Sequence, residues 1–219
     1  AEYERAYADF GHHPATPGFF IGDEPLHPAE FKACVRAYQI MREVSPELTP
    51  LLNFNPYWLG IETDFLGGQR FEDWLDNFID ASGCPLICYD CYWQMNPEEE
   101  GTNSYFLNLN KYTSAGKRKG VKVWNTLLSV GHFRYRVPSE DDLRWQLNTA
   151  VASGMKGILW FFVYMRNPVS NYRLAPIDEF GERTETFGWM SRVNRHFLHQ
   201  FGDFFLFRRF FLGQRFGNF

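Results

Sequence analysis

The chain has 219 residues, of which 45% are hydrophobic and 19% aromatic, and its formal net charge is −4. This is enough apolar material for one large core, and no shift in composition divides the chain, so we expect one domain over residues 1–219 with a terminal extension at 201–219. The acidic balance argues against nucleic acid as a partner, and the lack of an apolar run of about 18 residues argues against a membrane span.

The first segment, residues 1–13, reads as the end of an amphipathic helix and lacks the basic-then-apolar layout of a signal peptide. This says little about compartment, so a secreted or periplasmic location stays open. The apolar run 18–22 then stops at Asp23, Glu24 and Pro25. Because proline cannot donate to a strand ladder, we expect a short buried strand whose carboxyl end carries both carboxylates. Alternatively, Asp23 caps the next helix and Glu24 is a solvated loop charge.

Four further strands are expected, and they alternate with helices. The strands lie at 50–56, 85–93, 121–129 and 157–164. The helices run from Pro28 to Ser45, over 71–82 with Gly83 as the stop, from a Ser104 N-cap to Gly120, from a capping box of Ser139 and Asp142 to Gly154, and through Phe187 to Phe197. The segment 157–164 shows no alternation of polar and apolar residues, so we expect it to be buried on both faces.

This alternation predicts an α/β fold with a parallel sheet, either doubly wound or closed as a (β/α)8 TIM barrel. No glycine-rich phosphate turn follows any strand, and strand ends carry aromatic, amide or carboxylate residues, so we favour a partial barrel of about five β/α units. An open arc would expose two edge strands, so we expect a homo-oligomer or a missing N-terminal barrel half. Residues 204–212 are interpreted as a strand or an interface segment.

Three cysteines, Cys84, Cys88 and Cys91, have a spacing similar to the iron–sulfur triplet of radical-SAM barrels. On a regular strand, however, Cys88 and Cys91 point to opposite faces, so three thiolates would not converge on one cluster. We interpret these cysteines as buried free thiols, and we expect no metal and no cofactor.

The segment 13–25 resembles the fourth-strand signature of (β/α)8 glycoside hydrolases, especially the family 42 β-galactosidases and related barrels. The stretches 125–132 and 143–158 continue the resemblance into strands seven and eight. The resemblance implies that Glu24 is the general acid/base that protonates the glycosidic oxygen. Two departures stand out: Asp23 occupies the position of the family's Asn, and Leu127-Leu128-Ser129 occupies that of its nucleophilic Glu.

Position along the first strand agrees with an acid role, since Glu24, Gly22 and Phe20 share one parity and a glycine would leave room inside the barrel. Hydrolysis needs a second carboxylate, for which Asp90 at the tip of a later strand is the best candidate and Asp23 the other. Inward carboxylates on next-nearest strands would lie about 6.5–9.5 Å apart, which suits inversion.

Another mechanism is equally open. The Asp23-Glu24 and Tyr89-Asp90 pairs resemble those of substrate-assisted hexosaminidases, in which the acetamido oxygen of the substrate is the nucleophile. Asp90 as a mere loop cap also stays open at this point.

Sugar contacts are expected from side chains at or just after the strand ends. Trp160 and Tyr164 would form an aromatic platform, although Trp160 suits the core almost equally. The other candidates are Asn53, Asn55, Tyr57, Tyr89, Tyr92 and His132. His196 and His199 are interpreted as surface residues. The sequence thus predicts a glycoside hydrolase acting on an oligo- or polysaccharide through Glu24, and the alternative is a non-catalytic carbohydrate-binding or structural barrel.

Overall fold

Five parallel strands form one sheet in the computed structural model, which describes residues 2–165 and 171–207. The strands are β1 (Phe20–Asp23), β2 (Leu51–Phe54), β3 (Leu86–Asp90), β4 (Lys122–Leu128) and β5 (Gly157–Phe161), and they lie side by side in chain order. A strictly sequential order is that of a (β/α)8 barrel, whereas a doubly wound sheet reverses direction at a switch point. The predicted fold class, α/β with about five units of a parallel barrel, is confirmed.

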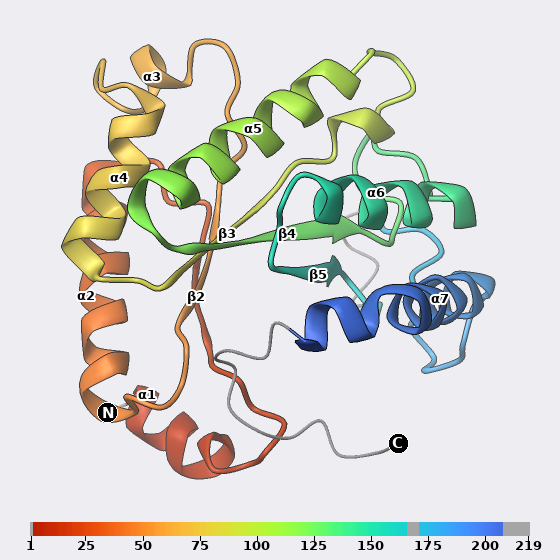
Figure 1. Cartoon of the computed structure of the whole chain (residues 1–219), viewed down its shortest axis with the longest axis horizontal. Coiled ribbons are helices and arrows are strands. Elements are labelled where there is room, and N and C mark those ends of the chain that lie inside the picture. The colour runs from red at the N-terminus through yellow and green to blue at the C-terminus, as the bar shows by residue number, and fades with distance from the viewer. Residues whose placement is uncertain (1, 166–170, 208–219) are drawn as a thin grey trace.

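A helix follows each strand. The helices are α1 (Glu2–Ala6), which continues into a π-helical turn at Tyr7–Gly11, α2 (Pro28–Val44), the short α3 (Ile61–Asp64), α4 (Phe71–Ser82), α5 (Thr102–Lys119), α6 (Glu140–Ala152) and α7 (Glu185–Phe207). In Figure 1, α2, α4, α5 and α6 follow one another around the outside of the strands. The opposite face of the sheet is therefore the one that would point into a barrel.

Local signals in the sequence explain where these helices begin and end. Ser139 Oγ accepts from the backbone N–H of Asp142 at 3.2 Å, and the Asp142 carboxylate accepts from the N–H of Ser139 at 2.8 Å, which confirms the capping box of α6. The predicted start of α5 at Ser104 is wrong. That helix begins at Thr102 after Gly101, where a Cβ would lie 2.0 Å from the carbonyl oxygen of Trp93.

The main hydrophobic core lies between the sheet and the helices, and aromatic rings dominate it. Phe54 of β2 meets Phe78 of α4 edge-to-face at 4.9 Å, and Tyr89 of β3 stacks on Tyr112 of α5 at 3.7 Å. All four rings are buried. Much of the aromatic content of the chain therefore belongs to this core rather than to a binding cleft.

The inner face of the sheet is less covered. Phe20, Leu51, Leu86, Trp124 and Leu159 line a groove at its N-terminal end, and Phe20 stays 57% exposed. The expectation that residues 157–164 are buried on both faces is wrong, because all five residues of β5 are only partly buried. Among the described strands β5 pairs with β4 alone, which makes it an edge.

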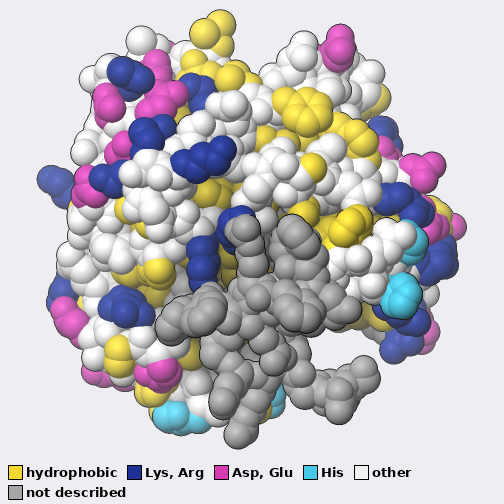
Figure 2. Space-filling model, viewed as in Figure 1, with side chains coloured by type: hydrophobic (Ala, Val, Ile, Leu, Met, Phe, Trp, Pro, Cys, Tyr) yellow, Lys and Arg dark blue, Asp and Glu magenta, His cyan; other side chains and the backbone are white. Residues whose placement is uncertain are grey.

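The C-terminal prediction is corrected in part. Helix α7 runs through Phe207, so residues 204–207 are helical and not a strand, while 208–219 lie outside the described residues. No helix among the described residues is both long enough and apolar enough to cross a membrane. On the face shown in Figure 2, acidic and basic side chains are interspersed.

Candidate active site

The carboxyl end of β1 is irregular, and this decides which side chains face inward. Phe20 pairs with Leu51 and Gly22 with Leu52, so the register shifts by one residue between them. A Cβ on Gly22 would lie 2.9 Å from Cys34 Sγ of α2, which places Gly22 on the helix side of the sheet. The predicted shared parity of Glu24, Gly22 and Phe20 is therefore wrong, because strand parity holds only for a regular ladder.

Asp23 is instead the inward carboxylate of β1. It pairs in register with Asn53 of β2, and Asn53 Nδ2 donates to Asp23 Oδ1 at 3.1 Å. The same nitrogen donates to Asp90 Oδ1 of β3 at 2.7 Å. These two bonds bring the acceptor oxygens within about 6 Å of each other. Three adjacent strands thus meet at one bridged pair of carboxylates.

Glu24 follows Asp23 in an uncommon backbone conformation. Its φ is +46°, in the left-handed region that costs a residue with a Cβ about 1–2 kcal/mol. Its N–H donates to the carbonyl oxygen of Asn53 at 2.7 Å, which extends the contact between β1 and β2 by one residue. Left-handed residues other than glycine cluster at functional sites, where the surrounding structure holds them in place.

The three carboxyl groups act on one another. Crowding by protein atoms, then the charges of Asp90 and Asp23, raise the pKa of Glu24 to about 8. Glu24 as a whole residue is exposed, but the two neighbouring charges act in the same direction as crowding, so the raised pKa does not depend on burial alone. Burial also raises the pKa of Asp90, to about 6, while hydrogen bonds from Asn53 and Tyr92 oppose that rise. Of these two groups, Glu24 therefore has the higher pKa.

Two residues that the sequence analysis did not assign to the site, Thr126 and Cys88, complete the inner face. Thr126 of β4 pairs in register with Asp90, and its hydroxyl donates to Asn53 Oδ1 at 3.3 Å. Cys88 Sγ lies 3.4 Å from Thr126 Oγ1. A threonine and a cysteine on apolar strands look like ordinary core residues, so only the pairing register of β2, β3 and β4 would have revealed them.

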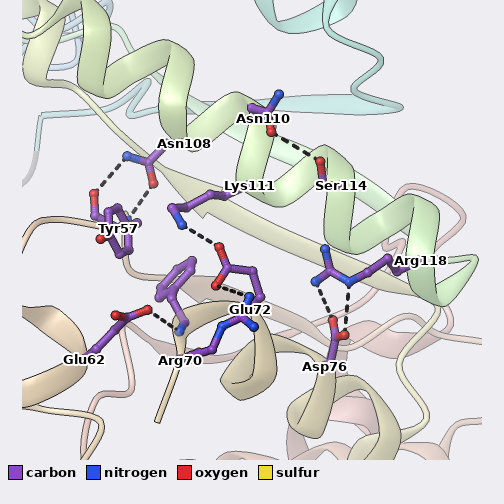
Figure 3. A network of polar contacts seen from close by, with 11 residues as sticks. Tyr57, Glu62, Arg70, Glu72, Asp76, Asn108, Asn110, Lys111, Ser114 and Arg118 are labelled. Carbon is purple, nitrogen blue, oxygen red and sulfur yellow. Dashed lines mark hydrogen bonds and ion pairs between the residues drawn. The ribbon is translucent and has the colours of Figure 1, made fainter. Parts of the chain in front are cut away.

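Three predicted sugar contacts lie on the wrong side of the sheet. Tyr57 packs against α4 and α5, with Lys111 Nζ 4.0 Å from its ring centroid and Asn108 bonded to its backbone (Figure 3). Tyr89 is fully buried against Tyr112. Trp160 Nε1 donates to Asn194 Oδ1 of α7 at 3.2 Å, so the expected platform of Trp160 with Tyr164 does not form. Each ring fills space between sheet and helices, which strand parity alone did not indicate.

The remaining candidates lie near the strand ends. Tyr92 is buried, and its pKa is raised by burial and by the charge of Asp90, which places it beside the carboxylates. His132 stacks on Tyr172 at 4.9 Å, and burial lowers its pKa. Asn55 is buried with its carbonyl bonded to the hydroxyl of Tyr112, and Tyr164 is 55% exposed.

The end of β4 carries no carboxylate. Leu128 is buried, and Ser129 Oγ donates to the carbonyl oxygen of Phe162 at 2.9 Å. The position that the resemblance assigns to a nucleophilic Glu is thus occupied by an apolar residue and a hydroxyl already engaged with the backbone. Within residues 2–165 and 171–207, no group of three or more His, Cys, Asp or Glu is arranged to hold a metal ion.

Solved structures with a similar fold are glycosidase barrels. A proposed α-L-fucosidase from Bacteroides thetaiotaomicron VPI-5482 matches with a TM-score of 0.57 and 13% identity, over 89% of this chain and 60% of that one. The β-galactosidase from the Antarctic haloarchaeon Halorubrum lacusprofundi has a TM-score of 0.53 and 15% identity, over 80% and 28%. The β-galactosidase from the psychrophilic Marinomonas ef1 has a TM-score of 0.56 and 12% identity, over 80% of this chain and 27% of that one.

These likenesses confirm the glycosidase-like barrel fold, and at such identities they speak of the fold alone. The chain spans 60% of the length of the first neighbour and less than a third of the other two. No protein-family model matches the chain, and no curated protein matches it in sequence.

Proposed function

We propose that this chain is the catalytic-acid-bearing part of a glycoside hydrolase barrel that cleaves a glycosidic bond in an oligo- or polysaccharide. The observation that carries the proposal is the position of Glu24, which stands at the carboxyl end of β1 beside the bridged pair of Asp23 and Asp90. Active sites of (β/α)8 barrels are built at this end of the strands.

The raised pKa of Glu24 gives the carboxyl groups different roles. Glu24 keeps its proton at neutral pH and donates it to the glycosidic oxygen as the C–O bond breaks. Asp23 and Asp90 share one amide donor and lie too close together for a water and a sugar to fit between them. The general acid is therefore Glu24, and the second carboxylate comes from the bridged pair. In an inverting reaction Asp90 takes the proton of the attacking water, and the enzyme recovers its charge state by exchange with solvent.

Substrate assistance uses the same groups differently. The acetamido oxygen of the substrate would attack the anomeric carbon, and Asp90 would orient the acetamido N–H. The lack of a carboxylate at the end of β4 is compatible with both routes, since neither needs a protein nucleophile there.

A second function is supported by one of these same observations. The same lack of a carboxylate at β4 favours a non-catalytic carbohydrate-binding or structural barrel.

The chain also spans only part of its structural neighbours, so we propose that its apolar inner groove, which includes Phe20 and Trp124, is covered by three further β/α units or by a second copy of this chain.

Hydrolysis of a panel of aryl glycosides tests the proposal. The panel includes β-galactosides and α-L-fucosides, which the names of the structural neighbours suggest, and N-acetylhexosaminides. Wild type, Glu24→Gln and the surface control Glu43→Gln are compared, with sugar binding and circular dichroism measured on each. Turnover lost only in Glu24→Gln, with binding retained, supports the hydrolase, and the preferred sugar selects the mechanism. Equal turnover in all three would overturn the role of Glu24, and binding without turnover would favour the second function.

A further inference from the structure

A continuous chain of hydrogen bonds crosses the inner face of four adjacent strands. It begins at Cys88 of β3, passes through Thr126 of β4 to Asn53 of β2, and divides there to reach Asp23 of β1 and Asp90 of β3. The donor–acceptor distances along it are 3.4, 3.3, 3.1 and 2.7 Å. Cys88, Asn53 and Thr126 are all buried, so bulk water does not substitute for these partners.

Chemistry fixes the direction of every proton in this chain. The Thr126 hydroxyl has one hydrogen, which it gives to Asn53 Oδ1, so its lone pairs accept from the thiol of Cys88. Burial raises the pKa of Cys88 to about 12, so the sulfur keeps its hydrogen and acts as a donor. Both hydrogens of the Asn53 amide are then free to point at the two carboxylates.

The opposite orientation of the amide would be unfavourable. It would turn the Asn53 carbonyl oxygen toward two carboxylates and remove the donor that they share. Among the described residues, the acidic or weakly acidic groups that interact electrostatically with Asp90 are Asp23 and Glu24 at the end of β1, Cys88 of β3, and Cys91, Tyr92, Tyr112 and Tyr135. None of the ion pairs between described residues includes Asp23 or Asp90. The amide of Asn53 is therefore a main source of positive charge density for the pair.

We propose that Thr126 is a positioning residue: it holds the Asn53 amide so that both of its hydrogens reach Asp23 and Asp90, which gives the two carboxylates a shared donor and leaves the proton of the site on Glu24. Cys88 supports Thr126 from the other side. The inference rests on the proposed hydrolase, because it explains how three crowded carboxyl groups divide into one acid and one accepting pair. It predicts that a hydroxyl at position 126, and not merely a side chain of that volume, sets the titration of Asp90.

Two substitutions separate the hydroxyl from the volume. Thr126→Val keeps the shape of the side chain and removes the hydroxyl, whereas Thr126→Ser keeps the hydroxyl. The first measurement is the carboxyl carbon titration of Asp90 by NMR, which needs no substrate. We expect Thr126→Val to raise the pKa of Asp90 by about one unit, because the free energy of one hydrogen bond in a network with charged groups corresponds to about one pKa unit. Thr126→Ser should leave this pKa within a few tenths of a unit. Thr149→Val, which removes a partly buried hydroxyl on α6, is the control and should leave the Asp90 titration unchanged.

Kinetics provide the second readout. For Thr126→Val we expect the acid limb of the kcat/KM profile to move up by about one unit and kcat to fall about tenfold, with KM changed less than about twofold. An unchanged Asp90 titration in Thr126→Val, or the same shift in Thr126→Ser, would overturn the proposal.

If Thr126→Val does not fold, Cys88→Ala replaces it, with Cys88→Ser as its matched control. A shift upward in Cys88→Ala alone supports the proposal, and no shift overturns it. A wild type without turnover would contradict the hydrolase and leave the titration result to decide the role of Thr126.

Discussion

The backbone N–H of Glu24 donates to the carbonyl oxygen of Asn53 at 2.7 Å, one residue beyond the end of β1. This bond ties the candidate acid to the same residue whose side chain bridges Asp23 and Asp90. Asn53 therefore contacts all three residues that carry these carboxyl groups: its carbonyl oxygen binds the backbone of Glu24, and its amide binds the carboxylates of Asp23 and Asp90. The left-handed φ of Glu24 is the geometric cost of this arrangement.

The first prediction tests whether the left-handed backbone at position 24 is strained. In Glu24→Gly the left-handed conformation is free of strain, whereas in Glu24→Ala the Cβ retains it. We expect Glu24→Gly to have a free energy of unfolding about 1 kcal/mol higher than Glu24→Ala, as measured by urea denaturation.

In the matched control, at Ala33, a glycine should change the free energy of unfolding in the opposite direction. Ala33 is exposed on α2, where glycine is a poor helix former, so Ala33→Gly should lower the free energy of unfolding by about 1 kcal/mol. If Glu24→Ala were as stable as Glu24→Gly, position 24 would carry no backbone strain.

The second prediction concerns pH. A carboxyl group whose pKa is raised in the folded state binds its proton more tightly there than in the unfolded chain. For Glu24 stability is therefore lost as pH rises from its ordinary pKa of 4.5 toward about 8. We expect the free energy of unfolding of wild type, relative to that of Glu24→Gln, to decrease steadily over this range.

Glu30→Gln is the control for this experiment. The backbone N–H groups of His27 and Leu26 lower the pKa of Glu30, so its contribution is lost only as pH falls below the ordinary value. Its difference from wild type should be constant from about pH 5 to 8. A constant difference for Glu24→Gln as well would show that its carboxyl group titrates alike in the folded and unfolded states.

Local signals predicted the helices and the strand order well. Gly83 and Gly120 end α4 and α5 in the left-handed conformation, and Ser139 starts α6, because caps depend on neighbours in sequence. The same local reasoning placed Asp23, Glu24 and Asp90 at strand ends, where they do meet.

Side-chain direction was harder to predict. The register shift between Phe20 and Gly22 reverses the parity of β1, and no local signal in the sequence marks it. Tyr89 and Trp160 illustrate the second difficulty, since a tyrosine or tryptophan at a strand end suits a cleft and a core equally well. The pairing partners in α5 and α7 decide between them, and these contacts are long-range.

The third prediction follows from the position of Trp160. Its indole N–H joins β5 to α7 through Asn194 Oδ1 at 3.2 Å. Trp160→Phe should lower the free energy of unfolding by about 1 kcal/mol or more and leave the affinity for any bound sugar unchanged. A double-mutant cycle with Asn194→Ala, read by urea denaturation and by calorimetric sugar titration, measures both effects. Lost sugar affinity at constant stability would return Trp160 to the binding face.

The last prediction concerns Gln146, whose buried side chain closes the end of β4. Its Oε1 accepts from the N–H of Leu128 at 2.9 Å and its Nε2 donates to the carbonyl oxygen of Leu128 at 3.1 Å. The next residue, Ser129, turns its N–H toward β5, so Leu128 faces the side of β3. There β3 has already ended, since its last residue, Asp90, pairs with Thr126. The amide of Gln146 replaces the missing strand.

Gln146→Leu should therefore be strongly destabilising although leucine is apolar and of similar size. The two backbone groups of Leu128 would be left buried without partners, at a cost of about 1–3 kcal/mol each. We expect a loss of at least about 2 kcal/mol in the free energy of unfolding by urea denaturation. Asn148→Leu, the same kind of change at an exposed position two residues further along α6, should cost less than about 0.5 kcal/mol. Equal effects of the two substitutions would mean that the amide contributes nothing at this strand end, and the end of β4 beside the candidate site would need another support.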